Sequence, residues 1–369
     1  AGQTPRVLYL PPGFSASVFA RLAGSPVRSI AVAGIGAVYV GVPRNGLVDL
    51  VADRDGDGFA EVYEPALRQR RCPYGLTVWN DHLYVAETTQ VSRFPLAPGG
   101  TGVLGAEEVL VEGLPEDACG PHGFRPLAVD PIDESLYVAL GSSCNVCLER
   151  GPGATQRARV WRYSAVARGE GSEVARGLRN VTDFALNPWG GALWGVAAER
   201  DDLGDDEPPE LITEIRAGAD YGWPSCYYGS DAQWHADLRV SAPGAEGGCQ
   251  GLTPPTTTYQ AHTAPLGLAF HDGVGLPDAF GPSLFVALHG SWDHSTGVGY
   301  KIVRLPLDES GQPDGDAQEF ALGWLPRPTS RASEDAWGRP VDIAVGPDGA
   351  LYVSDDGTGS IYRFSYDAP

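Results

Sequence analysis

Residues 343–354, IAVGPDGALYVS, form a short apolar run, a Gly-Pro-Asp-Gly turn and a second apolar run that carries a tyrosine. Such a pattern predicts two antiparallel strands joined by a tight turn. Five further copies precede it in the chain. They are SIAVAGIGAVYV (29–40), GLTVWNDHLYVA (75–86), LAVDPIDESLYVAL (127–140), FALNPWGGALWGV (184–196) and LAFHDGVGLPDAFGPSLFVAL (268–288).

Most copies continue into a further alternating strand, such as GLVDLVA, RVWRYS or SIYRFSY. Units of this length with several strands each are typical of β-propeller blades. The sequence therefore predicts an all-β protein: one six-bladed propeller domain over residues 1–369. The N-terminal stretch GFSASVFARL has no blade of its own, and we expect it to supply the outer strand of the last blade.

A second motif, DRDGDGFAEVYE at 53–64, has the ligand spacing of an EF-hand calcium loop, with carboxylates at Asp53, Asp55, Asp57 and Glu64. An EF-hand needs a helix on each side, whereas this segment lies between two strand-like runs. We therefore predict a hairpin turn and exclude a calcium sensor. Two interpretations stay open, a plain turn and a turn that holds a structural calcium ion.

Charge and cysteine content limit the partners and the compartment. The net charge of −21 argues against nucleic acid, and no run of 18 apolar residues exists to span a membrane. The six cysteines indicate disulfides, hence a periplasmic or secreted protein. Their connectivity is open, but three pairs are candidates by their placement: Cys72 with Cys119, Cys144 with Cys147 and Cys226 with Cys249.

The repeat also predicts where a functional site lies. Residues just before the first strand and just after the second strand of each blade share one end of the central channel. Polar residues at these positions are Arg44, Tyr74, His122, Arg125, Arg179, Asn180, Arg200, Asp201, Asp202, His262, His289 and Arg339. So many arginines in an acidic protein predict a site for a small polyanion, since arginine binds carboxylates in a bidentate manner. The alternative is that single arginines pair with Glu199, Asp201 or Asp342 as struts between blades.

Specific motifs resemble a known family. GLRNVTDFALNP, ERDDLGDDEPPEL, GADYGWPSCYYG, HTAPLGLAF, ALHGSWDHSTGVGYKIVRLPL and WGRPVDIAVGPDGALYVSDD are similar to the sorbosone dehydrogenase type of sugar dehydrogenase, which depends on pyrroloquinoline quinone (PQQ). The chain is more distantly similar to the soluble quinoprotein glucose dehydrogenases. The resemblance covers nearly the whole chain in order.

The resemblance implies roles for individual residues. His122, in PHGFRPLAVDP, matches the catalytic base of the family, and Arg179 and Asn180 of GLRN match residues that hold the quinone. Arg339 of WGRP matches an arginine that binds a cofactor carboxylate. His289 stands where glucose dehydrogenases have a lysine.

Two more implied positions depart from those relatives. His262 replaces a hydroxyl residue of the glucose dehydrogenases. The calcium ion of the family binds partly to two backbone carbonyls that match Asp201 and Asp202, where the glucose dehydrogenases have a Gly-Pro pair. Whether the side chains of these aspartates bind the ion is therefore an open question.

The expected function is a PQQ- and Ca²⁺-dependent oxidation of a sugar at its C1 hydroxyl or hydrated aldehyde, with hydride transfer to the quinone. Electrons would then pass to an external acceptor, a cytochrome or a quinone. One alternative is a calcium-dependent sugar lactonase, a hydrolase that needs carboxylates and amides around its metal and no arginine cluster. The other is a non-catalytic binding propeller that has lost PQQ.

Overall fold

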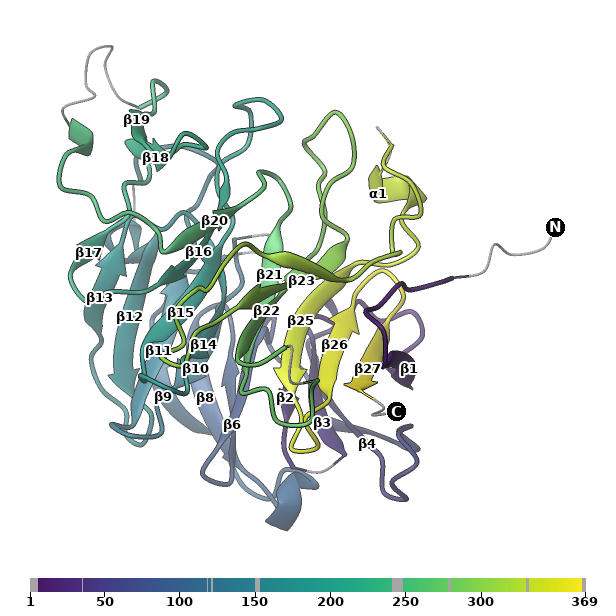
Figure 1. The fold of residues 1–369 in the computed structure, drawn as a ribbon. Coiled ribbons are helices and arrows are strands. Elements are labelled where there is room, and N and C mark those ends of the chain that lie inside the picture. Colours follow the sequence, from purple (N-terminus) through teal and green to yellow (C-terminus); the bar gives the residue numbers. More distant parts are fainter. Residues whose placement is uncertain are drawn as a thin grey trace.

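The protein is a six-bladed β-propeller with almost no helix, as the sequence predicts (Figure 1). The structure is a computed structural model and describes residues 6–34, 36–117, 119–120, 122–149, 153–240, 248–277, 280–329 and 332–366. The first strand of every blade contacts the first strands of both neighbouring blades, so these six strands form a closed ring around a channel.

Each blade is an antiparallel sheet whose strands follow one another from the channel outward. Blade 1 contains β2 (Ile30–Val32), β3 (Ala37–Val42), β4 (Leu47–Ala52) and β5 (Val62–Leu67). Blade 2 contains β6 (Gly75–Trp79), β7 (His82–Ala86), β8 (Gln90–Pro95) and β9 (Glu108–Glu112). Blade 3 contains β10 (Leu127–Val129), β11 (Ser135–Leu140), β12 (Arg159–Ser164) and β13 (Ser172–Arg176).

Blades 4 to 6 follow the same order, except that the N-terminal strand completes the last sheet. Blade 4 contains β14 (Val181–Leu186), β15 (Leu193–Ala197), β16 (Glu210–Glu214) and β20 (Thr257–Tyr259). Blade 5 contains β21 (Pro265–His271), β22 (Ser283–Leu288), β23 (Lys301–Pro306) and β24 (Gln318–Ala321). Blade 6 contains β25 (Pro340–Val345), β26 (Leu351–Asp355), β27 (Ser360–Tyr366) and β1 (Phe14–Arg21).

The remaining elements are short. β17 (Ala219–Asp220) adds to blade 3 in parallel with β13, and β18 (Cys226–Tyr228) pairs with β19 (Trp234–Ala236) in an insertion of blade 4. The helical turns are η1 (Pro43–Asn45), η2 (Pro98–Gly100), η3 (Ala154–Gln156) and α1 (Ala332–Asp335). In Figure 1 the β18–β19 hairpin and α1 lie at the upper end of the view, and the β4–β5 turn lies at the lower end.

The core explains why the second strands are apolar throughout. β3 and β22 are buried at all six of their positions, because each is covered by a neighbouring blade on both faces. One apolar cluster fills each of the six seams between blades. The repeated aromatic lies in these seams; Tyr39 and Tyr84, for example, are fully buried and donate their hydroxyl protons to Gly100 O and Ala165 O.

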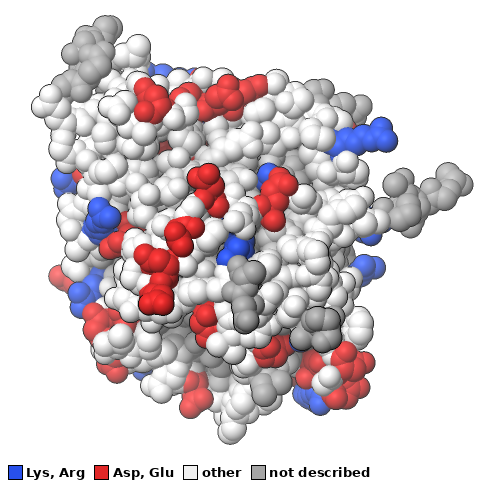
Figure 2. Space-filling view, viewed as in Figure 1, with Lys and Arg blue, Asp and Glu red and all other residues white. Residues whose placement is uncertain are grey.

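Acidic groups are spread widely over the surface. On the side shown in Figure 2, carboxylates lie among uncharged residues, and basic residues do not form a continuous patch there. No helix among the described residues is both long enough and apolar enough to span a membrane.

All six cysteines form disulfides, and the three pairs are those suggested by their placement in the chain. Cys72 joins Cys119, Cys144 joins Cys147 and Cys226 joins Cys249. The first of these connects the end of blade 1 to the segment before blade 3. The disulfides therefore tie irregular connections to the propeller rather than strands to one another.

The segment with EF-hand spacing is a hairpin turn between β4 and β5, which confirms the predicted hairpin, and no helix flanks it. Its carboxylates cap the turn: Asp53 accepts hydrogen bonds from the backbone N–H groups of Gly56 (2.7 Å) and Gly58 (2.8 Å). Asp57 accepts one from Phe59 (2.8 Å).

The prediction that Glu64 belongs to the same group of carboxylates as Asp53 and Asp55 is corrected by the structure. Glu64 lies within β5, paired with Leu50, three residues beyond the end of the turn. The carboxylate near Asp53 and Asp55 is that of Glu61, whose N–H bonds to Ala52 O as the turn closes. Glu64 is the third residue of β5, and because successive strand residues are about 3.3 Å apart, its backbone lies well beyond the turn. The turn is capped by its own backbone donors, and the carboxylates of Asp53, Asp55 and Glu61 lie close enough together to bind a cation, so both interpretations of the turn stay open.

Two aspartates inside the channel each connect their own blade to the next blade around the ring. Asp183 of β14 accepts the N–H of Leu268 in blade 5 (2.9 Å), and Asp342 of β25 accepts the N–H of Ile30 in blade 1 (2.8 Å). The two side chains are also hydrogen-bonded to each other, which requires a proton on one of them. Although they retain some contact with the channel, the surrounding protein raises the pKa of Asp342 to about 7, and burial and Asp342 raise that of Asp183 well above its ordinary value.

We expect this pair to make the fold less stable as pH rises. Unfolded aspartate ionises near pH 4, whereas the folded pair keeps its proton to about pH 7, so stability falls across that interval. Asp183→Asn should remove much of this dependence, because an amide can donate permanently to Asp342 and still accept from Leu268. Thermal unfolding at pH 5 and pH 8 tests it: the variant should have the higher melting temperature at pH 8, and an unchanged difference between the two pH values would contradict the shared proton.

Candidate active site

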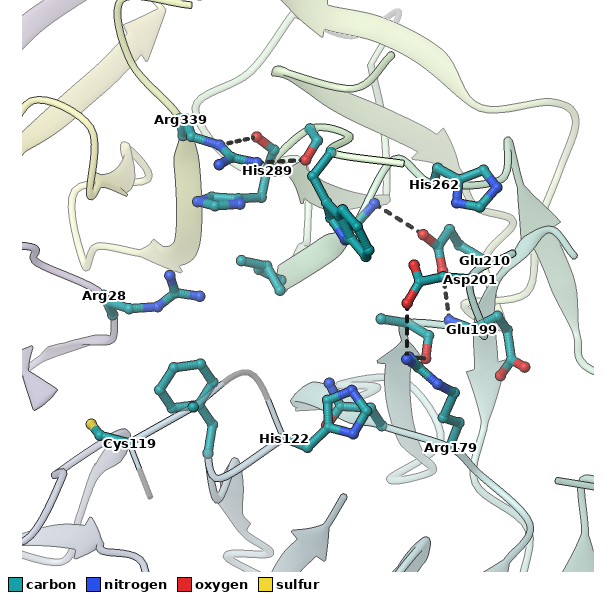
Figure 3. Close-up of a pocket in the computed structure, with 18 of the residues that line it drawn as sticks. Arg28, Cys119, His122, Arg179, Glu199, Asp201, Glu210, His262, His289 and Arg339 are labelled. Atoms are coloured by element: carbon teal, nitrogen blue, oxygen red, sulfur yellow. Dashed lines mark hydrogen bonds and ion pairs between the residues drawn. The ribbon is translucent and has the colours of Figure 1, made fainter. Parts of the chain in front are cut away.

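A cavity of about 410 Å³ opens at one end of the channel. Residues that precede first strands line it together with residues that follow second strands, as the repeat predicts. The first group contains Arg28, His122, Phe124, Arg179, Asn180, His262 and Arg339, and the second contains Arg44, Glu199, Asp201, His289 and Trp292. Five of the six blades thus contribute residues to this cavity. Figure 3 shows side chains from this lining arranged around one space.

His122 is held as a base on one wall of this cavity. Its Nδ1 lies 3.0 Å from Ser142 O and 2.9 Å from Ser142 Oγ. The carbonyl can only accept, and the Ser142 hydroxyl gives its own proton to Cys144 O (2.8 Å). Nδ1 therefore carries the hydrogen, and Nε2 keeps its lone pair, to which none of the described residues donates a hydrogen bond.

The surroundings keep this imidazole neutral. Burial lowers the pKa of His122 to about 4, and the nearby charge of Arg179 contributes in the same direction. A neutral histidine with a fixed tautomer and a bare Nε2 is suited to accept a proton.

Arginines occupy the opposite side of the cavity and its rim. Arg339 donates to His289 O (3.1 Å) and Gly290 O (2.6 Å), and Arg28 pairs with Asp356 (2.6 Å) while stacking on Phe124 (4.8 Å). Arg44 is exposed on the rim. Among the described residues, neither Arg44 nor Arg339 has an ion-pair partner. These cations remain available to an anionic ligand.

Acidic groups gather on the wall beside Arg179, as Figure 3 shows. Arg179 lies 3.3 Å from Asp201, and Glu210 accepts the N–H groups of Glu199 (2.8 Å) and Ala264 (3.0 Å). Burial raises the pKa of Glu199 to about 7 and that of Glu210 to about 8. Near neutral pH these two glutamates therefore add less negative charge than their number suggests.

Three carboxylate and imidazole groups here lie close enough to share a cation. Ligand atoms of Asp201, His262 and Asp293 all lie within 4.8 Å of one another. His262 donates from Nε2 to Gly204 O (2.8 Å), which leaves Nδ1 as the ligand atom.

The predicted Asp202 side chain is not part of this group. It is 53% exposed, pairs with Arg239 (3.0 Å) and does not line the cavity. Its backbone has positive φ (67°), so the chain turns at this residue and the side chain leaves the cavity wall.

Three other predicted residues also lie outside the cavity lining, which corrects the expectation that they meet there. Arg125 is fully buried and pairs with Asp117 (2.5 Å), and Arg200 pairs with Asp237 (3.1 Å). Tyr74 is stacked below Phe124 at 4.2 Å. Arg125 and Arg200 thus pair with carboxylates, as the strut interpretation expects, but with other partners than the predicted Glu199, Asp201 or Asp342. Asp117 is also shared with Arg157 (2.8 Å).

Sequence reasoning missed several residues of the site. Arg28 precedes β2 just as Arg339 precedes β25, so the same positional rule selects it. Trp292 follows β22 and stands at the mouth with 71% of its surface exposed. Ser142 and Asn145 carry no sequence signal, because their part in the site is only to hold other side chains.

The fold and the cavity define a six-bladed propeller whose channel mouth carries a positioned base, free arginines and a cluster of acids. The chain belongs to the TrAA12-like family, which matches residues 8–367.

Individual relatives include an uncharacterized protein of Borreliella burgdorferi, 26% identical over 377 residues that cover 100% of this chain and 93% of that protein. A PQQ-dependent pyranose dehydrogenase of Coprinopsis cinerea is 34% identical over 120 residues, which cover 29% of this chain and only 16% of that protein.

Solved structures share the fold over the whole chain. The carbohydrate-active enzyme family AA12 protein of Trichoderma reesei has a TM-score of 0.84 at 20% identity, covering 99% of both chains. The holo form of the PQQ domain of the Coprinopsis cinerea pyranose dehydrogenase has a TM-score of 0.81 at 19% identity, covering 99% of this chain and 98% of that one.

Proposed function

We propose that this protein is a sugar oxidoreductase that uses PQQ and Ca²⁺, with His122 as the base. The observation that carries the proposal is the cavity itself: a neutral histidine faces Arg44 and Arg339, for which the described part of the chain offers no ion-pair partner. Family membership and the sugar dehydrogenases among the relatives support it.

The residues present fit PQQ. This cofactor is a flat quinone with three carboxylates, and it needs cations at its edge and a cavity of moderate size. Arg44 and Arg339 supply cations without an ion-pair partner among the described residues, and Arg28 adds a third that is already paired with Asp356 (2.6 Å). The cavity volume of about 410 Å³ lies within the roughly 300–1,000 Å³ usual for small-molecule sites.

The acidic wall fits a divalent cation less completely. Asp201 and Asp293 offer the hard oxygen ligands that Ca²⁺ prefers, whereas the imidazole of His262 is not a usual calcium ligand. We therefore assign Asp201, and not the outward-facing side chain of Asp202, as the carboxylate nearest to the ion.

The protein's own part in the reaction is to bind, orient and accept a proton. His122 Nε2 would take the proton of a sugar hydroxyl, while Ser142 fixes the imidazole ring. Burial, with a contribution from the charge of Arg179, lowers the pKa of His122 and keeps it neutral, and Trp292 covers the mouth where a sugar enters. When bound, PQQ would supply the oxidant for the sugar carbon, and a Ca²⁺ ion beside Asp201 would supply Lewis acidity.

Three disulfides support a periplasmic or secreted location. After the sugar is oxidised, an external electron acceptor such as a cytochrome or quinone is required to regenerate the cofactor.

A hydrolase of the lactonase type is the second candidate, because carboxylates and Asn180 line the same cavity. The arginines count against it, since they have no purpose in metal-assisted hydrolysis of a neutral lactone. A binding propeller without catalysis is the third, and His122 counts against that.

The test is reconstitution. Protein mixed with PQQ and Ca²⁺ should retain the cofactor through gel filtration, and addition of an aldose should change its visible spectrum as the quinone is reduced. Failure to bind PQQ, or bound PQQ that no sugar reduces, would contradict the proposal. Lactone hydrolysis without PQQ would favour the second candidate.

A further inference from the structure

The Cys144–Cys147 disulfide closes a four-residue loop beside the cavity, which we call the disulfide loop (residues 144–147). The loop follows β11 and has no regular secondary structure. The loop contacts Arg179 and Asp201 on one wall of the cavity and, through Ser142, His122 on another. It makes these contacts with backbone oxygens and with the side-chain amide of Asn145.

Asn145 is the centre of this arrangement. Its backbone oxygen accepts from Arg179 Nε (3.0 Å) and from Trp223 Nε1 (3.2 Å). Its side-chain oxygen accepts from Arg179 Nη2 (3.1 Å) and from the N–H of Asp201 (2.8 Å). Its side-chain nitrogen donates to Asp201 O (3.3 Å) and Asp202 Oδ2 (3.2 Å). One residue thus fixes both the guanidinium and the acidic segment of the cavity wall.

The neighbouring residue of the loop holds the base. Cys144 O accepts the hydroxyl proton of Ser142 (2.8 Å), and this bond orients the Ser142 oxygen toward His122 Nδ1 (2.9 Å). Outside the loop, Glu149 accepts the N–H (2.6 Å) and hydroxyl (2.7 Å) of Ser143. The groups that face the cavity therefore depend on the conformation of a short irregular segment.

We propose that the disulfide loop is a redox-sensitive positioning element of the active site. With the disulfide intact, Asn145 and Ser142 hold Arg179, Asp201 and His122 in their places. Reduction by a dithiol breaks the Cys144–Cys147 bond and gives two thiols, while the dithiol becomes a disulfide. The loop then gains backbone freedom, and Asn145 no longer stays at the distances that hold Arg179 and Asp201.

The exposure of the disulfides makes this one the most open to reduction. Cys144 and Cys147 are both partly exposed, whereas Cys226 and Cys249 are only 5% and 4% exposed. In the third disulfide Cys119 is partly exposed but its partner Cys72 is only 7% exposed. Loss of the loop disulfide should not unfold the protein, because the bond lies outside every blade and closes only four residues.

This inference rests on the proposed function, because it treats His122, Arg179 and Asp201 as parts of an active site. The positioning itself can be tested in protein without any ligand. The charge of Arg179 is one of the causes that lower the pKa of His122. If Asn145→Ala lets Arg179 move away, the pKa of His122 should rise toward its ordinary value in the absence of any cofactor. Titration of the His122 imidazole by NMR, with the signal assigned from His122→Ala, measures this directly.

The experiment compares Asn145→Ala with Val146→Ala, a change in the same loop at a residue that makes none of these contacts. Asn145→Ala should raise the His122 pKa and weaken PQQ binding about 10-fold, the usual worth of a lost hydrogen bond to a charged group. Val146→Ala should do neither. An unchanged His122 titration in Asn145→Ala would overturn the inference. If the wild-type protein does not bind PQQ, the proposed function fails and the titration alone decides the inference.

A second comparison tests the disulfide. Cys144→Ser with Cys147→Ser should reproduce the effects of Asn145→Ala while cooperative unfolding persists. Cys226→Ser with Cys249→Ser should lower the melting temperature without changing the His122 titration. In the wild-type protein, the His122 pKa should rise as dithiothreitol releases the first two thiols. A normal titration in the Cys144/Cys147 variant would show that the disulfide has no part in positioning.

Discussion

His122→Ala should still bind PQQ and Ca²⁺ but should oxidise sugars about 10²- to 10⁴-fold more slowly, the usual contribution of a positioned general base. Binding should persist because the cations of the cavity are arginines, and none of them bonds to the His122 side chain. The loss should appear in kcat and kcat/KM together, since proton removal belongs to the transition state and not to ground-state binding. Steady-state kinetics with a saturating electron acceptor measures both.

Parallel variants make this test decisive. His262 and His289 also line the cavity, but each has its Nε2 engaged, with Gly204 O (2.8 Å) and Asp356 (2.9 Å). Their alanine variants should lose binding rather than the proton-transfer step. His82→Ala, a change at the first residue of β7 and away from the cavity, is the control for the loss of a histidine as such. Near-normal kcat in His122→Ala with a large loss in either of the others would mean that the base is misassigned.

The same residue sets the pH dependence of the wild-type enzyme. A histidine at its ordinary pKa would lose its basic form below about pH 6.5. Because burial and Arg179 lower the pKa of His122 to about 4, the base stays neutral and competent well below that. The acidic fall in kcat/KM should therefore lie near pH 4, and a midpoint near 6.5 would show that the imidazole is more exposed to water during the reaction than in this structure.

Much of the fold could be predicted because the repeat is visible in the sequence. The six copies give the number of blades, and their spacing gives the strand order. The residues around them then predict one end of the channel as the site. Arg44, His122, Arg179, His262, His289 and Arg339 were all placed on the cavity by this rule alone.

The positional rule does not predict which residues face the cavity when a side chain can instead pair with a carboxylate outside it. Arg125 and Arg179 each stand two positions before a first strand, yet one is buried against Asp117 and the other faces the cavity. Asp117 lies in an irregular connection, and no pattern in the sequence shows that it reaches Arg125. Asn145 escapes prediction for the same reason, since its contacts come from a disulfide loop with no strand periodicity.

Arg339→Ala should weaken PQQ binding by about 100-fold, or about 2.7 kcal/mol. Its guanidinium has donors to spare beyond those given to His289 O and Gly290 O, and hydrogen bonds between two charged groups are roughly twice as strong as neutral ones. Calorimetric titration of the protein with PQQ in the presence of Ca²⁺ measures the change. Arg44→Ala, at the exposed rim, should weaken binding only a few-fold, because solvent screens a charge there.

Arg339 both offers a positive charge to the cofactor and donates hydrogen bonds to the loop after β22. A lysine variant separates the effect of the charge from that of the guanidinium geometry. Removing the guanidinium also frees the carbonyls of the loop that carries His289 and Trp292, so some loss of melting temperature is expected in Arg339→Ala. Arg339→Lys keeps the positive charge but loses the planar fork that grips a carboxylate in a bidentate manner. If charge dominates, the lysine variant should recover most of the lost affinity; if the fork dominates, it should stay close to the alanine variant. Unchanged PQQ affinity in both variants would mean that Arg339 only supports the loop, and the cofactor would then have to bind elsewhere in the cavity.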